Sequence, residues 1–170
     1  MANLREIKKA FFELSDKEQE SILKEIYSFS KDIKEFLNVR LLNDGEELYI
    51  EKIRKATESS TPMGLPKTIK VTQVNSILNK AKKSKVKKDT LCEMEWIAFD
   101  GYMTSLNDYG GGPESYENKV YDHLKNYLLL LNDISKNDEL DGVKHYLREH
   151  TNMYYDHLWE LFEEITGESV

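Results

Sequence analysis

Residues 113–134 read PESYENKVYDHLKNYLLLLNDI, and this stretch decides the fold. Val120, Leu124, Tyr127, Leu131 and Ile134 recur at three- and four-residue spacing, which places them on one stripe of a helix. The leucines between Tyr127 and Leu131 add apolar surface on other sides of the same helix. A helix that is apolar on most sides is usually buried among neighbours. The stretch therefore predicts a central helix at about 114–134, with other helices packed around it.

Apolar residues recur at helical spacing along most of the remaining chain. The pattern predicts helices at about 4–14, 16–28, 30–43, 48–56, 69–84, 90–106 and 138–149, and a last helix that ends near Thr166. Ser15 and Glu18 have the spacing of a capping box at the start of the second helix. We expect the apolar residues of that helix to face inward: Ile22, Leu23, Ile26 and Tyr27. The predicted fold is all-α, with antiparallel helical hairpins in a bundle or a short irregular HEAT-like stack.

The chain of 170 residues is long enough for one helical domain with a substantial core. Residues 58–68 contain two prolines and a glycine, which favour a loop. Two lobes, at 1–57 and 69–170, are the alternative to a single unit. A short strand at about 68–72 is a local alternative to the start of the helix at 69–84.

One short motif occurs twice. Tyr121-Asp122-His123-Leu124 recurs 34 residues later as Tyr155-Asp156-His157-Leu158, and this offset equals a known period of helix-pair solenoids. Two copies are fewer than such arrays need, so coincidence between two amphipathic helices remains the alternative explanation.

The charge is unevenly distributed. The formal net charge is −7, yet residues 67–88 contain eight lysines and no acidic residue. The rest of the chain has 24 − 8 = 16 basic and 31 acidic residues, and its net charge is therefore −15. This asymmetry predicts one basic surface on an acidic protein.

The sequence also bears on the compartment. Cys92 is the only cysteine, so no disulfide can form within the chain. No apolar run approaches the roughly 18 residues that a bilayer-spanning helix needs, and the first residues lack the apolar core of a signal peptide. We expect a cytoplasmic protein without a membrane partner.

Two histidines and one glutamate are candidate ligands or catalytic groups. His123 lies beside the apolar stripe of the central helix, and His157 has the equivalent place on the last helix. Glu95 shares a helix face with Leu91 and Tyr102. If Glu95, His123 and His157 converge, they could hold a transition metal or perform acid/base chemistry. No recognised ligand motif is present, so hydrogen-bonded structural histidines are the alternative.

A lysine-rich segment covers residues 80–88. It could contact phosphates of nucleic acid or an acidic partner through Lys80, Lys82, Lys83, Lys85, Lys87 and Lys88. No aromatic residue lies between these lysines to stack on bases. The alternative is a solvated helix end, where lysines complement the helix dipole.

No catalytic or cofactor motif is present, so we expect no cofactor and favour a non-catalytic function. The chain has ten tyrosines, and aromatic side chains are enriched at protein interfaces. We therefore expect a protein–protein interaction module that binds an unidentified protein partner through an aromatic surface. The alternatives are a nucleic-acid-associated protein that uses residues 80–88, and a metal or acid/base enzyme with a site near Glu95, His123 and His157.

Several residues carry a family resemblance. They include Leu23, Tyr27, Ser30, Phe36-Leu37, Arg40-Leu41, Glu95-Trp96-Ile97-Ala98-Phe99 and Tyr109-Gly110-Gly111-Gly112. With these residues the chain resembles a family of small bacterial all-helical proteins, a domain of unknown function. The resemblance covers most of the chain and implies a bacterial helical protein. It implies no activity and no catalytic residue.

Overall fold

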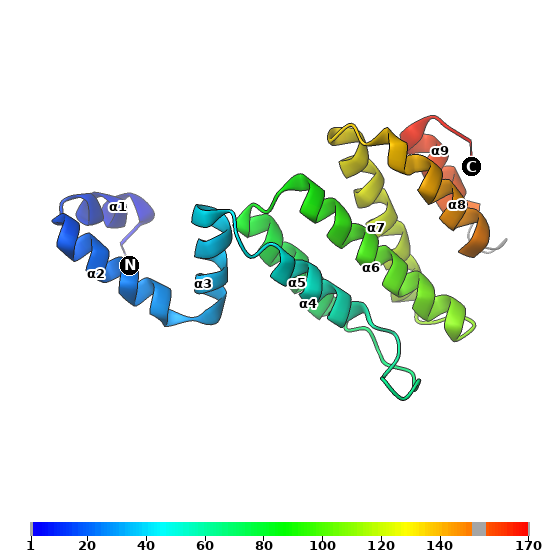
Figure 1. Ribbon diagram of the computed structural model, residues 1–170, viewed down its shortest axis with the longest axis horizontal. Coiled ribbons are helices and arrows are strands. Elements are labelled where there is room, and N and C mark those ends of the chain that lie inside the picture. Colours follow the sequence, from blue (N-terminus) through cyan, green and yellow to red (C-terminus); the bar gives the residue numbers. More distant parts are fainter. Residues whose placement is uncertain (1, 151–155, 170) are drawn as a thin grey trace. The chain divides into compact units, whose positions relative to one another are not determined.

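The computed structural model describes residues 2–150 and 156–169 and is all-α, as predicted (Figure 1). The chain divides into two compact units between Gly45 and Glu46. Unit 1 comprises residues 1–45 and unit 2 comprises residues 46–170. Among the described residues, no helix is both long and apolar enough to cross a bilayer.

Unit 1 consists of three α-helices and one π-helical turn. These are α1 (Leu4–Phe12), α2 (Asp16–Phe29), α3 (Lys31–Leu37) and η1 (Asn38–Leu42). The predicted cap of α2 forms, because the Ser15 amide donates to the Glu18 carboxylate at 2.9 Å. The Ser30 hydroxyl accepts from the Ile33 amide at 3.2 Å and so begins α3. Asn43, in the left-handed conformation at φ 51°, ends η1.

The side chains of unit 1 are mostly exposed. The structure describes α1 and α2 in full, and neither helix contains a buried residue. We expected Ile22, Leu23, Ile26 and Tyr27 to face inward, but Ile22 is only half-buried and the other three are exposed. The spacing correctly predicts that these residues share one helix face. It cannot show whether the same chain covers that face.

The described part of unit 2, residues 46–150 and 156–169, contains six α-helices and one 3₁₀ turn. These are α4 (Glu47–Thr57), α5 (Val71–Ser84), α6 (Lys88–Asp108), α7 (Glu114–Asp133), η2 (Asn137–Glu139), α8 (Leu140–His150) and α9 (Asp156–Thr166). The predicted central helix is α7, which packs most extensively on α6 and also contacts α9. Helix α6 contacts α4 and α5 on its other side, so that α6 and α7 together form the centre of this unit (Figure 1).

The core of unit 2 is formed by large side chains of α6 and α7. Phe99, Tyr102 and Met103 of α6 and Val120 and Leu124 of α7 are fully buried. Their positions follow the apolar stripes expected for the two helices.

Helices α4 and α6 approach closely at Gly101. A Cβ atom at Gly101 would lie 2.5 Å from the Cβ atom of Thr57 and 2.8 Å from its carbonyl oxygen. Glycine is therefore required at this crossing.

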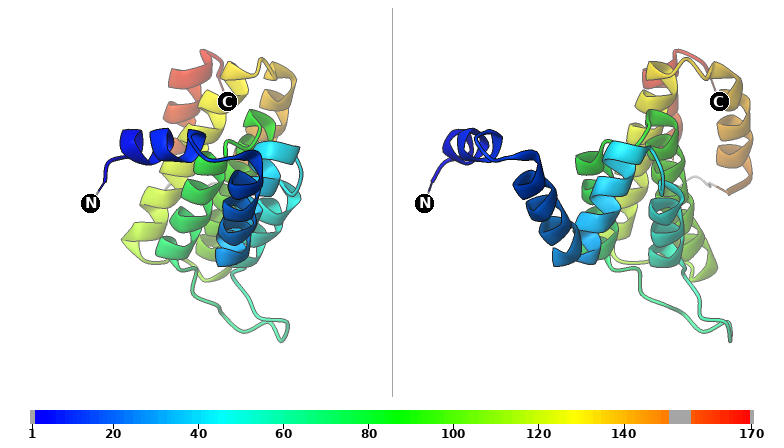
Figure 2. Two further views of the ribbon diagram at one scale, coloured as in Figure 1. Left: turned by 90° about the vertical axis from the view of Figure 1, so that its left-hand side faces the viewer. Right: turned by 60° about the vertical axis from the view of Figure 1, so that its left-hand side comes forward.

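The loop between α4 and α5 extends beyond the ends of the helices (Figure 2). It carries one isolated antiparallel bridge, between Ser60 and Pro66, and residues 68–70 form no strand before α5 begins. The two-lobe alternative places the boundary in this loop, whereas the chain divides between Gly45 and Glu46. The physical reason is that α4 packs on α5 and α6 and so belongs with the helices that follow it.

Candidate functional site

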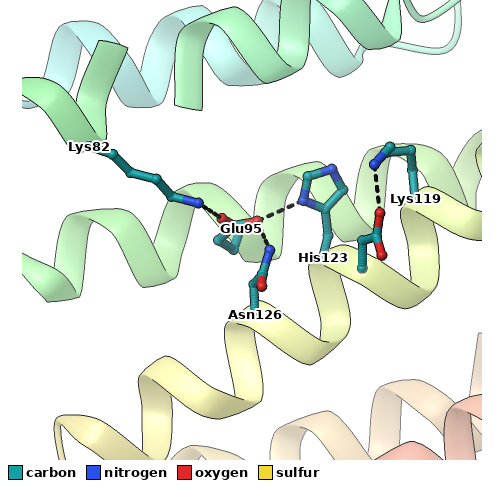
Figure 3. A network of polar contacts seen from close by, with 6 residues as sticks. Lys82, Glu95, Lys119, His123 and Asn126 are labelled. Atoms are coloured by element: carbon teal, nitrogen blue, oxygen red, sulfur yellow. Dashed lines mark hydrogen bonds and ion pairs between the residues drawn. The ribbon is translucent and has the colours of Figure 1, made fainter. Parts of the chain in front are cut away.

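Glu95 and His123 meet in the interior of unit 2. The Glu95 Oε2 atom lies 2.6 Å from the Nδ1 atom of His123, joining α6 to α7 (Figure 3). Glu95 Oε1 accepts a hydrogen bond from the Lys82 ammonium of α5 at 3.1 Å, and Oε2 accepts from the Asn126 amide at 3.5 Å. These four residues form the Glu95 network, in which three side chains point toward one carboxylate (Figure 3).

The network keeps the Glu95 carboxylate charged. Burial opposes ionisation, since it disfavours a charge in a medium of low polarity. Hydrogen bonding and charge attraction from His123 and Lys82 outweigh burial, and the pKa of Glu95 is lowered from its ordinary value of 4.5. The side chains of Glu95 and His123 are 1% and 4% exposed, whereas that of Lys82 is 46% exposed. Lys82 is thus the part of the network that water reaches.

The second nitrogen of His123 is enclosed. Its Nε2 atom and the hydroxyl of Tyr102 are buried and have no hydrogen-bond partner among the described atoms. The two rings stack, with centroids 5.7 Å apart and an interplanar angle of 7°. A general base must come within hydrogen-bond reach of the proton that it removes. In this arrangement Nδ1 is occupied by Glu95 and Nε2 is covered by protein.

A polar hollow of about 240 Å³ lies over the network. Besides Glu95, Lys82 and His123, it is lined by Asn75, Leu78, Asn79, Lys119, Asp122, Lys125 and Asn126. Lys119 and Asp122 pair with each other at 2.6 Å (Figure 3). The hollow is small, and Lys82, Glu95, Lys119 and Asp122 are each paired with another residue of its lining.

His157 does not join the Glu95 network. It is exposed on α9, and its ring stacks on Tyr121 with centroids 6.1 Å apart. Within residues 2–150 and 156–169, no group of three or more His, Cys, Asp and Glu side chains could hold a metal ion. The structure therefore brings together Glu95 and His123, but not the three candidate ligands.

The Tyr-Asp-His-Leu motif has different surroundings in its two occurrences. Leu124 and Leu158 are both fully buried, whereas His123 is buried and His157 is exposed. Tyr155, the first residue of the second occurrence, lies outside the described residues.

The lysine-rich segment is divided between two helices and a turn. Its six lysines are all exposed: Lys80, Lys82, Lys83, Lys85, Lys87 and Lys88. Lys85 ends α5 in the left-handed conformation at φ 55°, and Lys88 begins α6. Glu95 binds the ammonium group of Lys82, and Asp133 binds that of Lys88 at 2.5 Å. Part of the positive charge is therefore matched by carboxylates of the same chain.

Trp96 lies at the centre of an aromatic cluster. Its ring centroid is 5.2 Å from that of Phe99, 4.9 Å from Tyr127 and 5.0 Å from Tyr146. Burial raises the pKa of Tyr127 and of Tyr146, so their hydroxyls stay protonated and donate to Glu139 and Asp100. Within residues 2–150 and 156–169, most tyrosines are buried or half-buried, and Tyr27 and Tyr109 are exposed.

Two hollows flank Trp96. One, of about 310 Å³, is lined by Glu47, Ile50, Asp89, Thr90, Cys92, Glu93, Trp96, Tyr127, Lys136 and Glu139. The other, of about 410 Å³, is lined by Trp96, Tyr127, Asp138, Glu139, Gly142, Val143, His145, Tyr146 and His150. Cys92 lies at the first hollow as a free, buried thiol. Burial raises its pKa to about 12, with a further rise from Glu139, so it is not an activated nucleophile.

A further hollow lies in unit 1, where the sequence predicts no site. It has a volume of about 560 Å³ and an almost entirely apolar lining. We call it the N-terminal groove, and it is lined by Leu23, Lys24, Tyr27, Leu37, Asn38, Leu41 and Leu42. Leu41 and Leu42 are 63% and 69% exposed. The signal in the sequence is two successive amphipathic helices, at about 16–28 and 30–43.

Comparisons with known proteins assign no family to the chain. No family model, no curated protein and no solved structure matches it.

Proposed function

We propose that this chain is a non-catalytic helical module that binds another protein chain through the apolar face of unit 1. The observation that carries the proposal is the N-terminal groove, together with the exposed apolar side chains of the helices that form it. Exposed apolar surface of this extent is rare on monomers and is typical of binding sites for other proteins.

The form of the groove supports a helical ligand. Two helices and a π-helical turn line it, and the polar groups among its lining residues are those of Lys24, Asn38 and the Tyr27 hydroxyl. Apolar grooves between helices commonly bind the apolar face of an amphipathic helix, which inserts side chains spaced by three and four residues. The exposed leucines at positions 41 and 42 would form the centre of the contact.

The alternative functions have less support. An acid/base enzyme needs an accessible base, and the free nitrogen of His123 is enclosed. Nucleic-acid binding through residues 80–88 lacks stacking aromatics, and two of the six ammonium groups are bound by Glu95 and Asp133.

Two matched variants test the proposal. Leu41→Glu places a charge in the groove, and Leu65→Glu places one at a leucine of similar exposure, 60%, in the loop of unit 2. The tagged wild-type chain and both tagged variants are each expressed in cells together with the untagged wild-type chain. The proteins retained at stoichiometric amounts, including the untagged chain, are quantified. We expect wild type and Leu65→Glu to retain the same partner, and Leu41→Glu to lose it. Equal retention by both variants, or none by wild type, would reject the proposed binding face.

A further inference from the structure

We infer that the partner in the N-terminal groove is a second copy of this chain, which inserts its own helix α1. This inference rests on the proposed function and names the ligand of the same groove. It starts from two surfaces of unit 1 that are complementary in chemistry and largely exposed.

The first surface is the groove itself. The residues that line it come from α2, α3 and η1, and none comes from α1. The second surface is the apolar stripe of α1. Leu4 and Ile7 are 80% and 56% exposed, and with Phe11 they follow the three- and four-residue spacing of a helix that binds in a groove.

Both surfaces are small. Helix α1 has nine residues and is therefore about 13 Å long, at about 1.5 Å per residue. Helix α1 therefore presents one short row of apolar side chains, and the groove is lined by seven residues.

The exposed apolar area agrees with that of a stable dimer. Ten large apolar residues of the described part of unit 1 are exposed: Leu4, Ile7, Phe12, Leu23, Ile26, Tyr27, Phe29, Phe36, Leu41 and Leu42. Their exposed fractions amount to about six whole side chains, so a contact that covers all ten would bury roughly 900 Å², at about 150 Å² each. A standard protein interface buries about 800 Å² on each partner, and homodimer interfaces are the more apolar ones.

The charge of unit 1 also permits self-association. Residues 1–45 contain eight basic and nine acidic side chains, a net charge of −1. Residues 46–170 contain 24 − 8 = 16 basic and 31 − 9 = 22 acidic side chains, a net charge of −6. Two copies of unit 1 can therefore approach with little repulsion, whereas two copies of unit 2 would repel each other.

A two-fold arrangement satisfies both surfaces at once. In a symmetric dimer each copy offers the same patch, so that α1 of each chain enters the groove of the other. The competing arrangement is closure within one chain, in which α1 folds back over α2 at the short link of residues 13–15. The experiment separates these two arrangements.

Sedimentation equilibrium of the full chain tests the dimer. At about 100 µM we expect wild type and Leu65→Glu to have twice the chain mass of 19.9 kDa. Leu41→Glu should weaken dimerisation by at least about 30-fold, because it charges the centre of an apolar contact. A wild type with the mass of one chain, or a Leu41→Glu variant that dimerises like wild type, would overturn the inference.

Disulfide trapping tests the exchange of α1. Chains with Ile7→Cys and with Leu41→Cys are mixed, oxidised with diamide and separated without reductant; the buried Cys92 remains in both. We expect a covalent dimer of one chain of each kind, and none when Leu65→Cys replaces Leu41→Cys. A chain with both Ile7→Cys and Leu41→Cys that forms only an internal disulfide would show closure within one chain and overturn the inference.

The two levels of the proposal can fail separately. Suppose that wild type is a monomer and retains a different protein at stoichiometric amounts, and that the Leu41→Glu variant does not retain it. The inference of a homodimer then fails, and the proposed function stands. If wild type is a monomer and Leu41→Glu changes the retention of no protein, both fail.

Discussion

Replacing Glu95 with alanine should destabilise unit 2 by about 3 kcal/mol. The largest part of this loss of stability comes from His123. Its Nδ1 atom loses its partner at 2.6 Å, and its Nε2 atom has no hydrogen-bond partner among the described atoms. An unsatisfied buried polar group costs about 1–3 kcal/mol. The space left by the side chain adds about 1 kcal/mol. Lys82 contributes less than about 1 kcal/mol, because water can replace the carboxylate at its half-exposed ammonium group.

Urea unfolding followed by tryptophan fluorescence measures this loss, since Trp96 and Trp159 both belong to unit 2. With a slope of about 2 kcal/mol per M, the midpoint should fall by about 1.5 M. Glu93→Ala is the matched control on the same helix. Its carboxylate lies 3.9 Å from Arg54 and both side chains are at least half exposed, so the loss should stay below about 1 kcal/mol.

The pH dependence has a definite sign. The folded-state pKa of Glu95 lies below 4.5, so the stability that the carboxylate contributes is complete above about pH 4.5. It is lost as the pH falls through the folded-state value. The difference in stability between wild type and Glu95→Gln should therefore be largest near neutral pH and shrink in acid. Equal losses of unfolding free energy in Glu95→Ala and Glu93→Ala would refute this reasoning. So would a difference in stability between wild type and Glu95→Gln that does not change with pH.

Two further predictions concern the packing of unit 2. Gly101→Ala should destabilise the protein by about 1–2 kcal/mol, because the new methyl group meets the backbone of Thr57 and overpacking outweighs the gain in helix propensity. Gly142→Ala, in α8 with nothing within 4 Å of the new atom, should stabilise the protein by up to about 1 kcal/mol. Thermal denaturation measures the change in stability of both variants. A change of the same sign in both would contradict the account. Cys92 should react with Ellman's reagent at pH 8 only as fast as unit 2 opens, because the thiol is buried and its pKa is raised to about 12. Rapid modification of the folded protein would show that this part of the core is open.

The helices and their ends could largely be predicted from the sequence because their signals are local. Ser15 and Ser30 precede helices and bond to their first turns, as their spacing suggests. The contact between Glu95 and His123 could also be predicted from the sequence. Each residue lies on the buried face of a helix, and those two helices form the centre of unit 2.

Other features depend on tertiary packing and could not be predicted from spacing. His157 has nearly the same local sequence as His123, yet it lies on the exposed side of its helix. An amphipathic pattern such as that around Leu23 shows that a helix needs an apolar partner. It does not show whether that partner is in the same chain, and in unit 1 the apolar face remains uncovered.

Photo-crosslinking from the N-terminal groove tests the central claim, that this groove binds a protein chain, most directly. The photoreactive residue p-benzoylphenylalanine is placed at Leu41 in one sample and at Leu65 in the control, and cells that contain the full chain are irradiated. The account predicts one dominant covalent adduct from position 41, identified by mass spectrometry, and no such adduct from position 65. The absence of any adduct from position 41, or the same adducts from both positions, would contradict it.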